Sequence, residues 1–246
     1  MNPLTNETTP LDPRDRLAVA LDFPSAQLAL DLVDRLSDTC LWFKVGMELH
    51  YAEGNRLVET IRSRGFNVFL DLKLHDIPNT VAGAVRSAAQ AGASLLTLHA
   101  AGGLAMMAAA AEAAKAPDAP RLLAVTVLTS MDAGELTGVG VSASPAEQVL
   151  RLARLARQAG ISGIVSSAEE IGALRAELGP EVLLVIPGIR PSGSDIGDQK
   201  RIATPRTAIQ DGASMLVVGR PITRAADPAQ AAQSILEEIA LAARAV

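Results

Sequence analysis

Five ionisable side chains fall where short apolar runs of the sequence end. Asp22 follows the first run, Lys44 lies in the second, and Asp71, Lys73 and Asp76 lie in or just beyond the third. An apolar strand has no structural reason to carry them, because a buried charge without a partner is very costly. Asp71 and Lys73 are two residues apart, so on a strand their side chains share a face and can touch.

The spacing favours a lysine that keeps its proton. Carboxylates on either side stabilise the cationic form of Lys73, which suits it to donate a proton and to stabilise a carbanion. A Schiff-base lysine needs a lowered pKa, which Asp71 and Asp76 oppose. Lys44 completes a row of alternating charges if Asp76 folds back or comes from a second subunit. The row indicates chemistry through an anionic intermediate, and a salt-bridge network that only closes the end of the fold is the alternative.

A second group lies late in the chain and suits a phosphate. Segment 187–190 follows the seventh apolar run, and Gly219 and Arg220 follow the eighth. Glycine lets backbone amides approach an anion, and arginine adds charge and a planar fork of donors. Turn glycines with solvated arginines are the alternative. The long loop 190–201 is typical of a lid, from which Gln199 can reach a phosphate.

Other polar residues carry weaker signals. Thr129 and Ser130 close the fifth run, where they either contact a base or cap a loop. His75 and His99 also lie near run ends, and we expect structural roles for them because a lysine already supplies the proton. Cys40 has no basic neighbour in the sequence, so we expect an inert, packed thiol.

Eight apolar, β-branched runs alternate with helical patterns along the chain. Each is apolar on both faces, as buried parallel strands are. The predicted strands are 17–21, 41–45, 66–72, 94–98, 122–127, 163–166, 182–186 and 215–218. Ser144-Pro145 and Thr204-Pro205 predict helix starts. Left-handed glycines that end helices are predicted at Gly65, Gly92, Gly160, Gly179 and Gly212.

This alternation leaves two α/β architectures, a closed barrel and an open doubly wound sheet. Eight strands without a long linker favour a single (β/α)8 TIM barrel over residues 15–246, after a flexible lead-in at 1–14. In either architecture ligands bind at the C-terminal ends of the strands, where the charged residues fall.

The amino-acid composition argues against several classes of function and partner. The 246 residues are 49% hydrophobic, 20% charged and 2% aromatic, with a net charge of −5, which argues against nucleic acid as a partner. One cysteine and three histidines without zinc spacing predict no disulfide and no structural metal. Segment 91–111 lacks charged residues, but its glycine pair at 102–103 argues against a membrane span. We expect a cytoplasmic protein without a secretory signal.

The segment Asp71-Leu-Lys-Leu-His-Asp-Ile-Pro-Asn-Thr80 resembles the signature of the orotidine 5′-phosphate decarboxylase family. Further family-like segments follow in order over nearly the whole chain: Leu21-Asp22, Phe43-Lys44-Val-Gly46, Val125-Thr-Val-Leu-Thr-Ser130, Pro187-Gly-Ile-Arg190, Asp198-Gln199 and Val218-Gly-Arg220. Sugar-phosphate decarboxylases and synthases of the same barrel group share Asp-x-Lys-x-x-Asp. The Ile-Pro-Asn-Thr and Leu-Thr-Ser segments separate this sequence from them.

The resemblance implies a homodimeric barrel that converts orotidine 5′-monophosphate to UMP and CO2 in pyrimidine biosynthesis, without a cofactor or metal. It implies that Lys73 protonates C6 while Asp71 faces the departing carboxylate. Lys44 and Asp22 would position the ribose, and Asp76 would reach the partner's site across the dimer interface.

The resemblance also implies the substrate contacts. Those to the phosphate are Arg190, Gln199, Gly219 and Arg220, and those on the ribose or pyrimidine side are Thr129 and Ser130. Ile77, Thr80 and Pro187 are further substrate-binding residues. Two alternatives remain open. One is a magnesium-dependent sugar-phosphate decarboxylase or aldolase of the same barrel group, and the other is a non-catalytic nucleotide-binding module that keeps Gln199 and Arg220.

Overall fold

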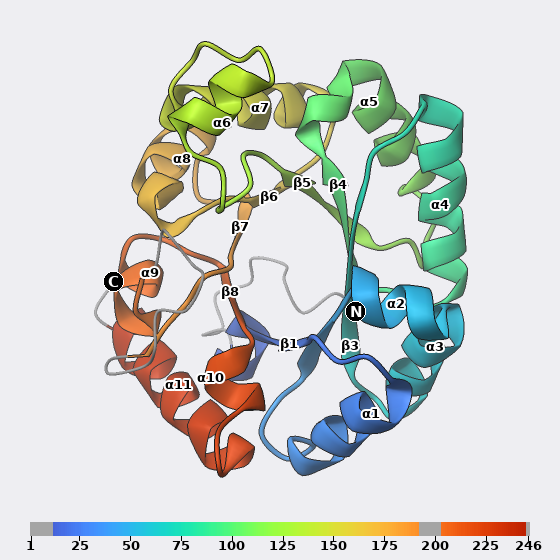
Figure 1. Cartoon of the computed structure of the whole chain (residues 1–246), viewed down its shortest axis with the longest axis vertical. Coiled ribbons are helices and arrows are strands. Elements are labelled where there is room, and N and C mark those ends of the chain that lie inside the picture. Colours follow the sequence, from blue (N-terminus) through green and yellow to red (C-terminus); the bar gives the residue numbers. More distant parts are fainter. Residues whose placement is uncertain (1–11, 192–202, 245–246) are drawn as a thin grey trace.

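The computed structural model describes residues 12–191 and 203–244 and contains a closed barrel of eight parallel strands (Figure 1). The strands are β1 (Leu17–Leu21), β2 (Trp42–Gly46), β3 (Asn67–Leu74), β4 (Leu95–His99), β5 (Arg121–Val125), β6 (Gly163–Val165), β7 (Leu183–Ile186) and β8 (Met215–Val218). Each strand pairs with the next in chain order, and β1 pairs with β8. This closure confirms the predicted barrel and excludes the open sheet.

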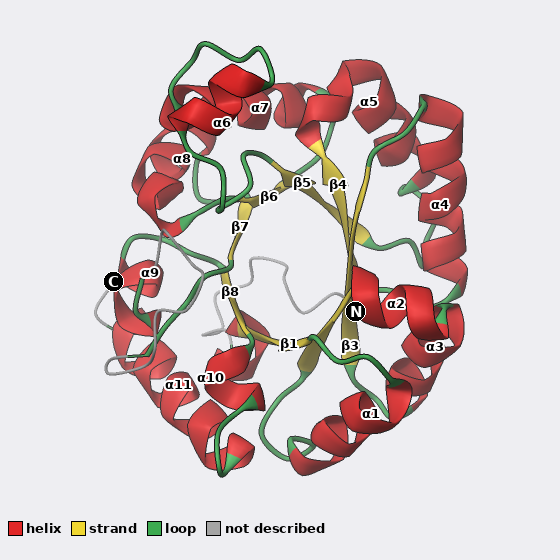
Figure 2. Cartoon of the chain, in the orientation of Figure 1, coloured by secondary structure: helices red, strands yellow, loops and turns green. Residues whose placement is uncertain are grey.

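Helices surround the ring of strands (Figure 2). They are α1 (Ala26–Arg35), α2 (Met47–Glu53), α3 (Asn55–Ser63), α4 (Pro78–Gln90), α5 (Gly103–Ala113), α6 (Ala133–Gly138), α7 (Pro145–Gln158), α8 (Ile171–Leu178), α9 (Pro205–Gln210), α10 (Arg220–Thr223) and α11 (Pro228–Ala243). Short 3-10 turns are η1 (Pro13–Arg16), η2 (Ala100–Gly102) and η3 (Ala168–Glu170). Most of the predicted lead-in, residues 1–11, lies outside the described residues.

The predicted strands agree with the observed ones to within two residues at each end. The predicted helix signals also hold, since Ser144 and Thr204 cap α7 and α9 with capping boxes. All five predicted glycines have a positive φ. One detail is wrong: β5 ends at Val125, so Thr129 and Ser130 lie in the following turn rather than closing the strand. The prediction placed the end of this strand too late because the apolar residues continue past Val125, the last residue that pairs with β6.

The barrel has an apolar interior and a separate apolar layer beneath the helices. On β1, Ala18 and Ala20 belong to the interior cluster, whereas Leu17, Val19 and Leu21 pack in the outer layer. The interior cluster is Ala18, Ala20, Trp42, Phe69, Leu95, Leu123, Leu183, Val185, Met215 and Val217. This alternation is the period of two that a strand imposes on its side chains.

The inward-facing positions become polar toward the C-terminal ends of the strands. On β2, β3 and β4, the residues two positions after the interior Trp42, Phe69 and Leu95 are Lys44, Asp71 and Thr97. The same periodicity that fills the barrel with apolar side chains therefore places a polar layer at its C-terminal end. Toward the opposite end, Trp42 is buried and its Nε1 donates to Asp15 Oδ1 at 3.1 Å.

No helix within residues 12–191 and 203–244 is both long and apolar enough to cross a membrane. The uncharged segment 91–111 holds β4, η2 and most of α5.

Candidate active site

Four charged side chains form a continuous row across the C-terminal ends of β1, β2 and β3. Lys73 Nζ donates to both oxygens of Asp71, at 2.8 and 2.9 Å. Lys44 Nζ lies 3.6 Å from Asp71 Oδ2 and donates to Asp22 Oδ1 at 3.1 Å. The structure thus brings together residues up to 51 positions apart in the sequence, Asp22 and Lys73, in alternating charge order.

The row is buried at its centre and open at its Asp22 end. The exposed fraction of the side chain is 13% for Asp71 and 11% for Lys44, but 63% for Asp22. Burial alone would raise the pKa of Asp71. The charges of Lys44 and Lys73 and the hydrogen bonds from Lys73 and Thr97 outweigh burial and hold this pKa below its ordinary value. Asp71 is therefore a carboxylate at neutral pH, as the row requires.

The backbone at Lys73 leaves the regular strand conformation. Its φ is 50°, and in the described part of the chain no other non-glycine residue has a positive φ. The pairing of β3 with β4 shifts register between Leu70 and Leu74. A left-handed residue other than glycine costs roughly 1–2 kcal/mol. Such a conformation persists where neighbouring groups hold it, and it is common at functional sites.

Thr97 on β4 is a site residue that the sequence did not single out. Its hydroxyl accepts a hydrogen bond from the Lys73 backbone N–H at 2.9 Å and donates one to Asp71 Oδ1 at 2.9 Å. The available signal was a hydroxyl inside an apolar run, on the face that points into the barrel.

Asp76 does not join the row within its own chain. It is exposed, and its Oδ1 accepts a hydrogen bond from the Ile77 N–H at 2.6 Å. Ile77 is 67% exposed, and Thr80 is exposed in the first turn of α4. Of the two routes predicted for Asp76, folding back is therefore not observed.

Two glycines, Gly46 at the end of β2 and Gly219 just after β8, lie beside Asp22. A Cβ atom at Gly46 would lie 3.2 Å from Lys44 Nζ and 3.4 Å from Asp22 Oδ1. A Cβ atom at Gly219 would lie 3.7 Å from Asp22 Oδ2, and Arg220 begins α10 immediately after it. Gly219, which is predicted to bind a phosphate, thus lies beside the exposed Asp22 end of the row, and Arg220 follows it in the chain.

The other predicted binding residues lie in loops beyond the strands. Pro187 follows β7, and Arg190 is buried, with its backbone N–H bonded to the Ala203 carbonyl at 2.9 Å. Thr129 is half-buried and Ser130 exposed in the turn between β5 and α6. Gln199, with most of the predicted lid, lies outside the described residues.

His75 and His99 lie beside each other, with ring centroids 5.6 Å apart. Burial, with the nearby His75 and Lys73, lowers the pKa of His99. Burial raises the pKa of the Cys40 thiol to about 12, which agrees with an inert thiol. Among the residues that the structure describes, no group of three or more His, Cys, Asp or Glu side chains is placed to hold a metal ion.

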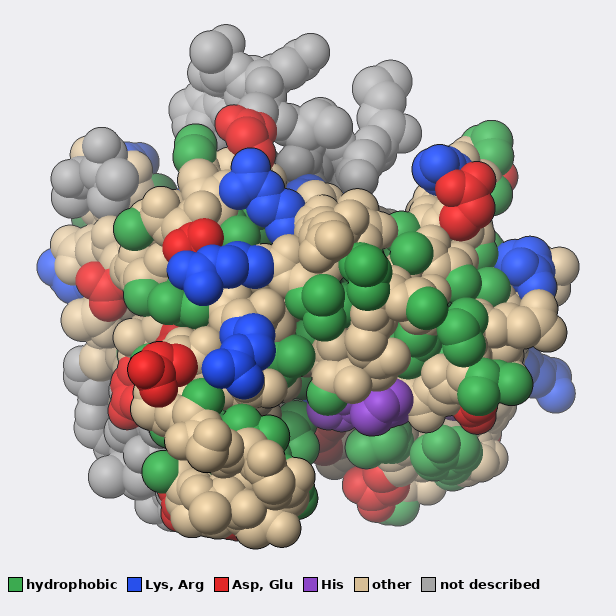
Figure 3. Space-filling view, turned by 90° about the horizontal axis from the view of Figure 1, so that it is seen from above, with side chains coloured by type: hydrophobic (Ala, Val, Ile, Leu, Met, Phe, Trp, Pro, Cys, Tyr) green, Lys and Arg blue, Asp and Glu red, His purple; other side chains and the backbone are tan. Residues whose placement is uncertain are grey.

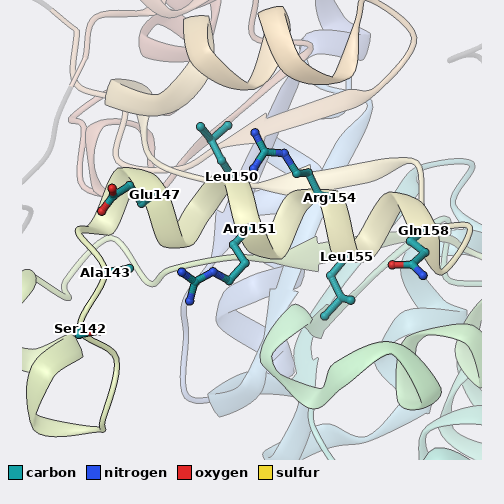
Figure 4. Close-up of a pocket in the computed structure, with 8 residues that line it drawn as sticks. All are labelled: Ser142, Ala143, Glu147, Leu150, Arg151, Arg154, Leu155 and Gln158. Carbon is teal, nitrogen blue, oxygen red and sulfur yellow. The ribbon is translucent and has the colours of Figure 1, made fainter.

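A hollow of about 860 Å³ is lined by α7 and by residues 142 and 143 before it, and by none of the four residues of the charged row (Figure 4). Of the arginines that line it, Arg154 pairs with Glu177 at 2.8 Å. Basic and acidic side chains are mixed on this side of the molecule (Figure 3). The charged row, rather than this hollow, is where chemistry-bearing residues converge.

A (β/α)8 barrel with paired charges at the C-terminal ends of its strands defines a class of proteins that bind their ligands there. The model of the orotidine 5′-phosphate decarboxylase / HUMPS family matches residues 15–235, and the chain belongs to this family.

Relatives named orotidine 5′-phosphate decarboxylase support this assignment. The protein from Pseudomonas putida is 52% identical over 91% of this chain and 96% of its own length, and the protein from Mannheimia succiniciproducens is 50% identical over 92% and 97%. The crystal structure of orotidine 5′-phosphate decarboxylase from Lactobacillus acidophilus superposes with a TM-score of 0.82 at 38% identity, covering 92% of this chain and 99% of that one.

Proposed function

We propose that this protein is a carboxy-lyase that converts orotidine 5′-monophosphate to UMP and CO2 in pyrimidine biosynthesis. The observation that carries the proposal is the Lys73 ammonium, held by both oxygens of Asp71 at the C-terminal end of the barrel. Family membership and the names of the relatives supply the substrate. A biosynthetic enzyme of this kind would work in the cytoplasm on a soluble substrate.

In the proposed reaction the bond between C6 and the carboxylate breaks, and its electron pair stays on C6. This vinyl carbanion has no π delocalisation, so a fixed ammonium beside C6 is its most direct stabiliser. Lys73 Nζ gives its proton to C6, which forms UMP, and the neutral amine regains a proton from solvent. In this mechanism no metal or organic cofactor takes part in these steps.

Asp71 and the rest of the row have supporting roles in this mechanism. Asp71 holds the Lys73 ammonium and faces the substrate carboxylate, whose repulsion eases as CO2 leaves. Lys44 and Asp22 offer a donor and an acceptor at the open end of the row, which suits the ribose hydroxyls.

The remaining contacts anchor the nucleotide away from the reacting carbon. Arg190, Gln199, Gly219 and Arg220 would hold the phosphate, and Ile77, Thr80, Thr129, Ser130 and Pro187 would surround the ribose and pyrimidine. Binding energy from these remote groups can be used to orient the base beside Lys73.

We also propose that the active unit is a homodimer with shared sites. Asp76 is exposed, and it makes no ion pair within the part of the chain that the structure describes. Apolar side chains near the same strand ends are exposed too: Met47 at 44%, Tyr51 at 81% and Ile77 at 67%. A second copy packed here would cover them and bring Asp76 of the partner subunit to Lys73, which completes the alternating row.

The test is turnover of orotidine 5′-monophosphate, followed by ultraviolet absorbance in EDTA. The wild-type protein should convert the substrate. Lys73→Ala should lower kcat by about 100-fold to 1,000-fold, as removal of a transition-state donor does. Circular dichroism and UMP binding serve as controls for folding.

Two outcomes would favour the alternatives. Activity that disappears in EDTA and returns with magnesium would indicate a metal-dependent relative of the same barrel group. UMP binding by folded wild type without turnover would indicate a nucleotide-binding module.

A further inference from the structure

Thr97 lies at the junction between β3 and β4, beneath the charged row. Its side chain is on the inward face of β4, and the residue is 1% exposed. The Lys73 N–H can only donate, so the Thr97 hydroxyl oxygen accepts from it at 2.9 Å. Asp71 is a carboxylate and can only accept, so the hydroxyl hydrogen points to Asp71 Oδ1, at 2.9 Å. One hydroxyl therefore binds both the Lys73 backbone N–H and the Asp71 carboxylate.

The hydroxyl takes the place of a missing backbone partner. In a regular parallel pair, successive backbone N–H groups bond to carbonyls of the neighbouring strand. The β3–β4 pairing is interrupted between Leu70 and Leu74, where Lys73 adopts its φ of 50°. The Lys73 N–H is partly buried, where an unpaired donor is costly, and Thr97 supplies an acceptor where the interrupted strand pairing does not.

We propose that Thr97 is a positioning residue, which sets the Lys73 ammonium by fixing both the backbone of Lys73 and the carboxylate of Asp71. The inference rests on the proposed decarboxylation. Thr97 acts through these two residues, whereas the nucleotide is anchored by other groups. Its loss should therefore lower kcat and leave KM nearly unchanged, because misplacement by about 1 Å at a reacting group can cost about 100-fold in rate.

The test compares Thr97→Val, which keeps the shape and removes the hydroxyl, with Thr97→Ser, which keeps the hydroxyl. Thr97→Val should lower kcat by about 10-fold to 100-fold with KM within about 3-fold, and Thr97→Ser should stay within about 3-fold of wild type in both. If Thr97→Val does not fold, Thr97→Ala replaces it in the comparison.

Thr126→Val is the matched control. Thr126 is also buried, at 4% exposed, and its hydroxyl donates to the Val165 carbonyl at 3.0 Å rather than to a residue of the charged row. Its substitution should cost similar stability in urea unfolding but leave kcat unchanged. An equal fall in kcat for Thr126→Val and Thr97→Val would assign the effect to packing and overturn the proposal.

A crystal structure of Thr97→Val gives a readout that does not depend on turnover. Asp71 should shift away from Lys73 Nζ, and Lys73 should leave its left-handed conformation. Unchanged geometry at both residues, or an unchanged kcat in an active enzyme, would overturn the positioning role. Failure of wild type to decarboxylate orotidine 5′-monophosphate would instead overturn the proposed function, and the crystal structure would still decide whether Thr97 holds the pair.

Discussion

The carboxylate of Asp71 lies between two ammonium groups, 2.8 Å from Lys73 Nζ and 3.6 Å from Lys44 Nζ. Asp71→Asn would leave the buried Lys44 and the half-buried Lys73 without their shared counter-ion. We expect the free energy of unfolding to fall by roughly 3 kcal/mol at neutral pH, the lower end for a broken buried pair, because Lys44 keeps Asp22. Urea unfolding of the two proteins measures this difference.

The pH dependence of that difference has a defined sign. The fold lowers the pKa of Asp71 below its ordinary value of 3.8, so it favours the ionised form. The resulting stability is present above about pH 3.8 and is lost as the pH falls through the lower, folded-state pKa. The gap between wild type and Asp71→Asn should therefore close in strong acid. A gap that is constant with pH, or a more stable variant, would contradict this account.

At the scale of elements, β6 depends on a glycine. A Cβ atom at Gly163 would lie 2.4 Å from Leu123 Cδ2 and 2.6 Å from the Leu122 carbonyl oxygen on the neighbouring β5. Because backbone cannot move aside cheaply, Gly163→Ala should destabilise the barrel by about 2 kcal/mol or more. Thermal or urea unfolding measures the change.

The control for this prediction is Gly172→Ala in α8, where nothing lies within 4 Å of the added Cβ. Alanine is the better helix former, so this variant should be neutral or more stable by up to about 1 kcal/mol. Equal losses from both substitutions would mean that the close approach of β5 and β6 is not what requires glycine at position 163.

At the scale of the whole molecule, the proposed homodimer with shared sites predicts complementation between two inactive chains. Lys73→Ala and Asp76→Ala should each be nearly inactive alone. After subunit exchange in a 1:1 mixture, activity should return to about a quarter of wild type, because half of the dimers are mixed and each has one intact site of two. No recovery in dimers shown to exchange subunits would exclude shared sites.

The sequence predicted those features whose cause is local. Eight apolar runs, capping at Ser144 and Thr204, and left-handed glycines such as Gly65 each follow from residues a few positions apart. The contact between Asp71 and Lys73 was also predicted, from the period of two along a strand, but the positive φ of Lys73 was not. The end of β5 was misplaced because strand ends depend on pairing with the neighbour, and the apolar run continued past Val125.

By itself, then, the sequence determined the eight strands, their alternation with helices and the end of the fold where charges gather. Only the tertiary structure decided how these residues meet. Barrel closure and strand register set Lys44 between Asp71 and Asp22, placed the Thr97 hydroxyl under Lys73, and left Asp76 outside the row of its own chain. The physical reason is that register between strands is a long-range property, fixed by packing across the whole barrel and not by the pattern within one strand.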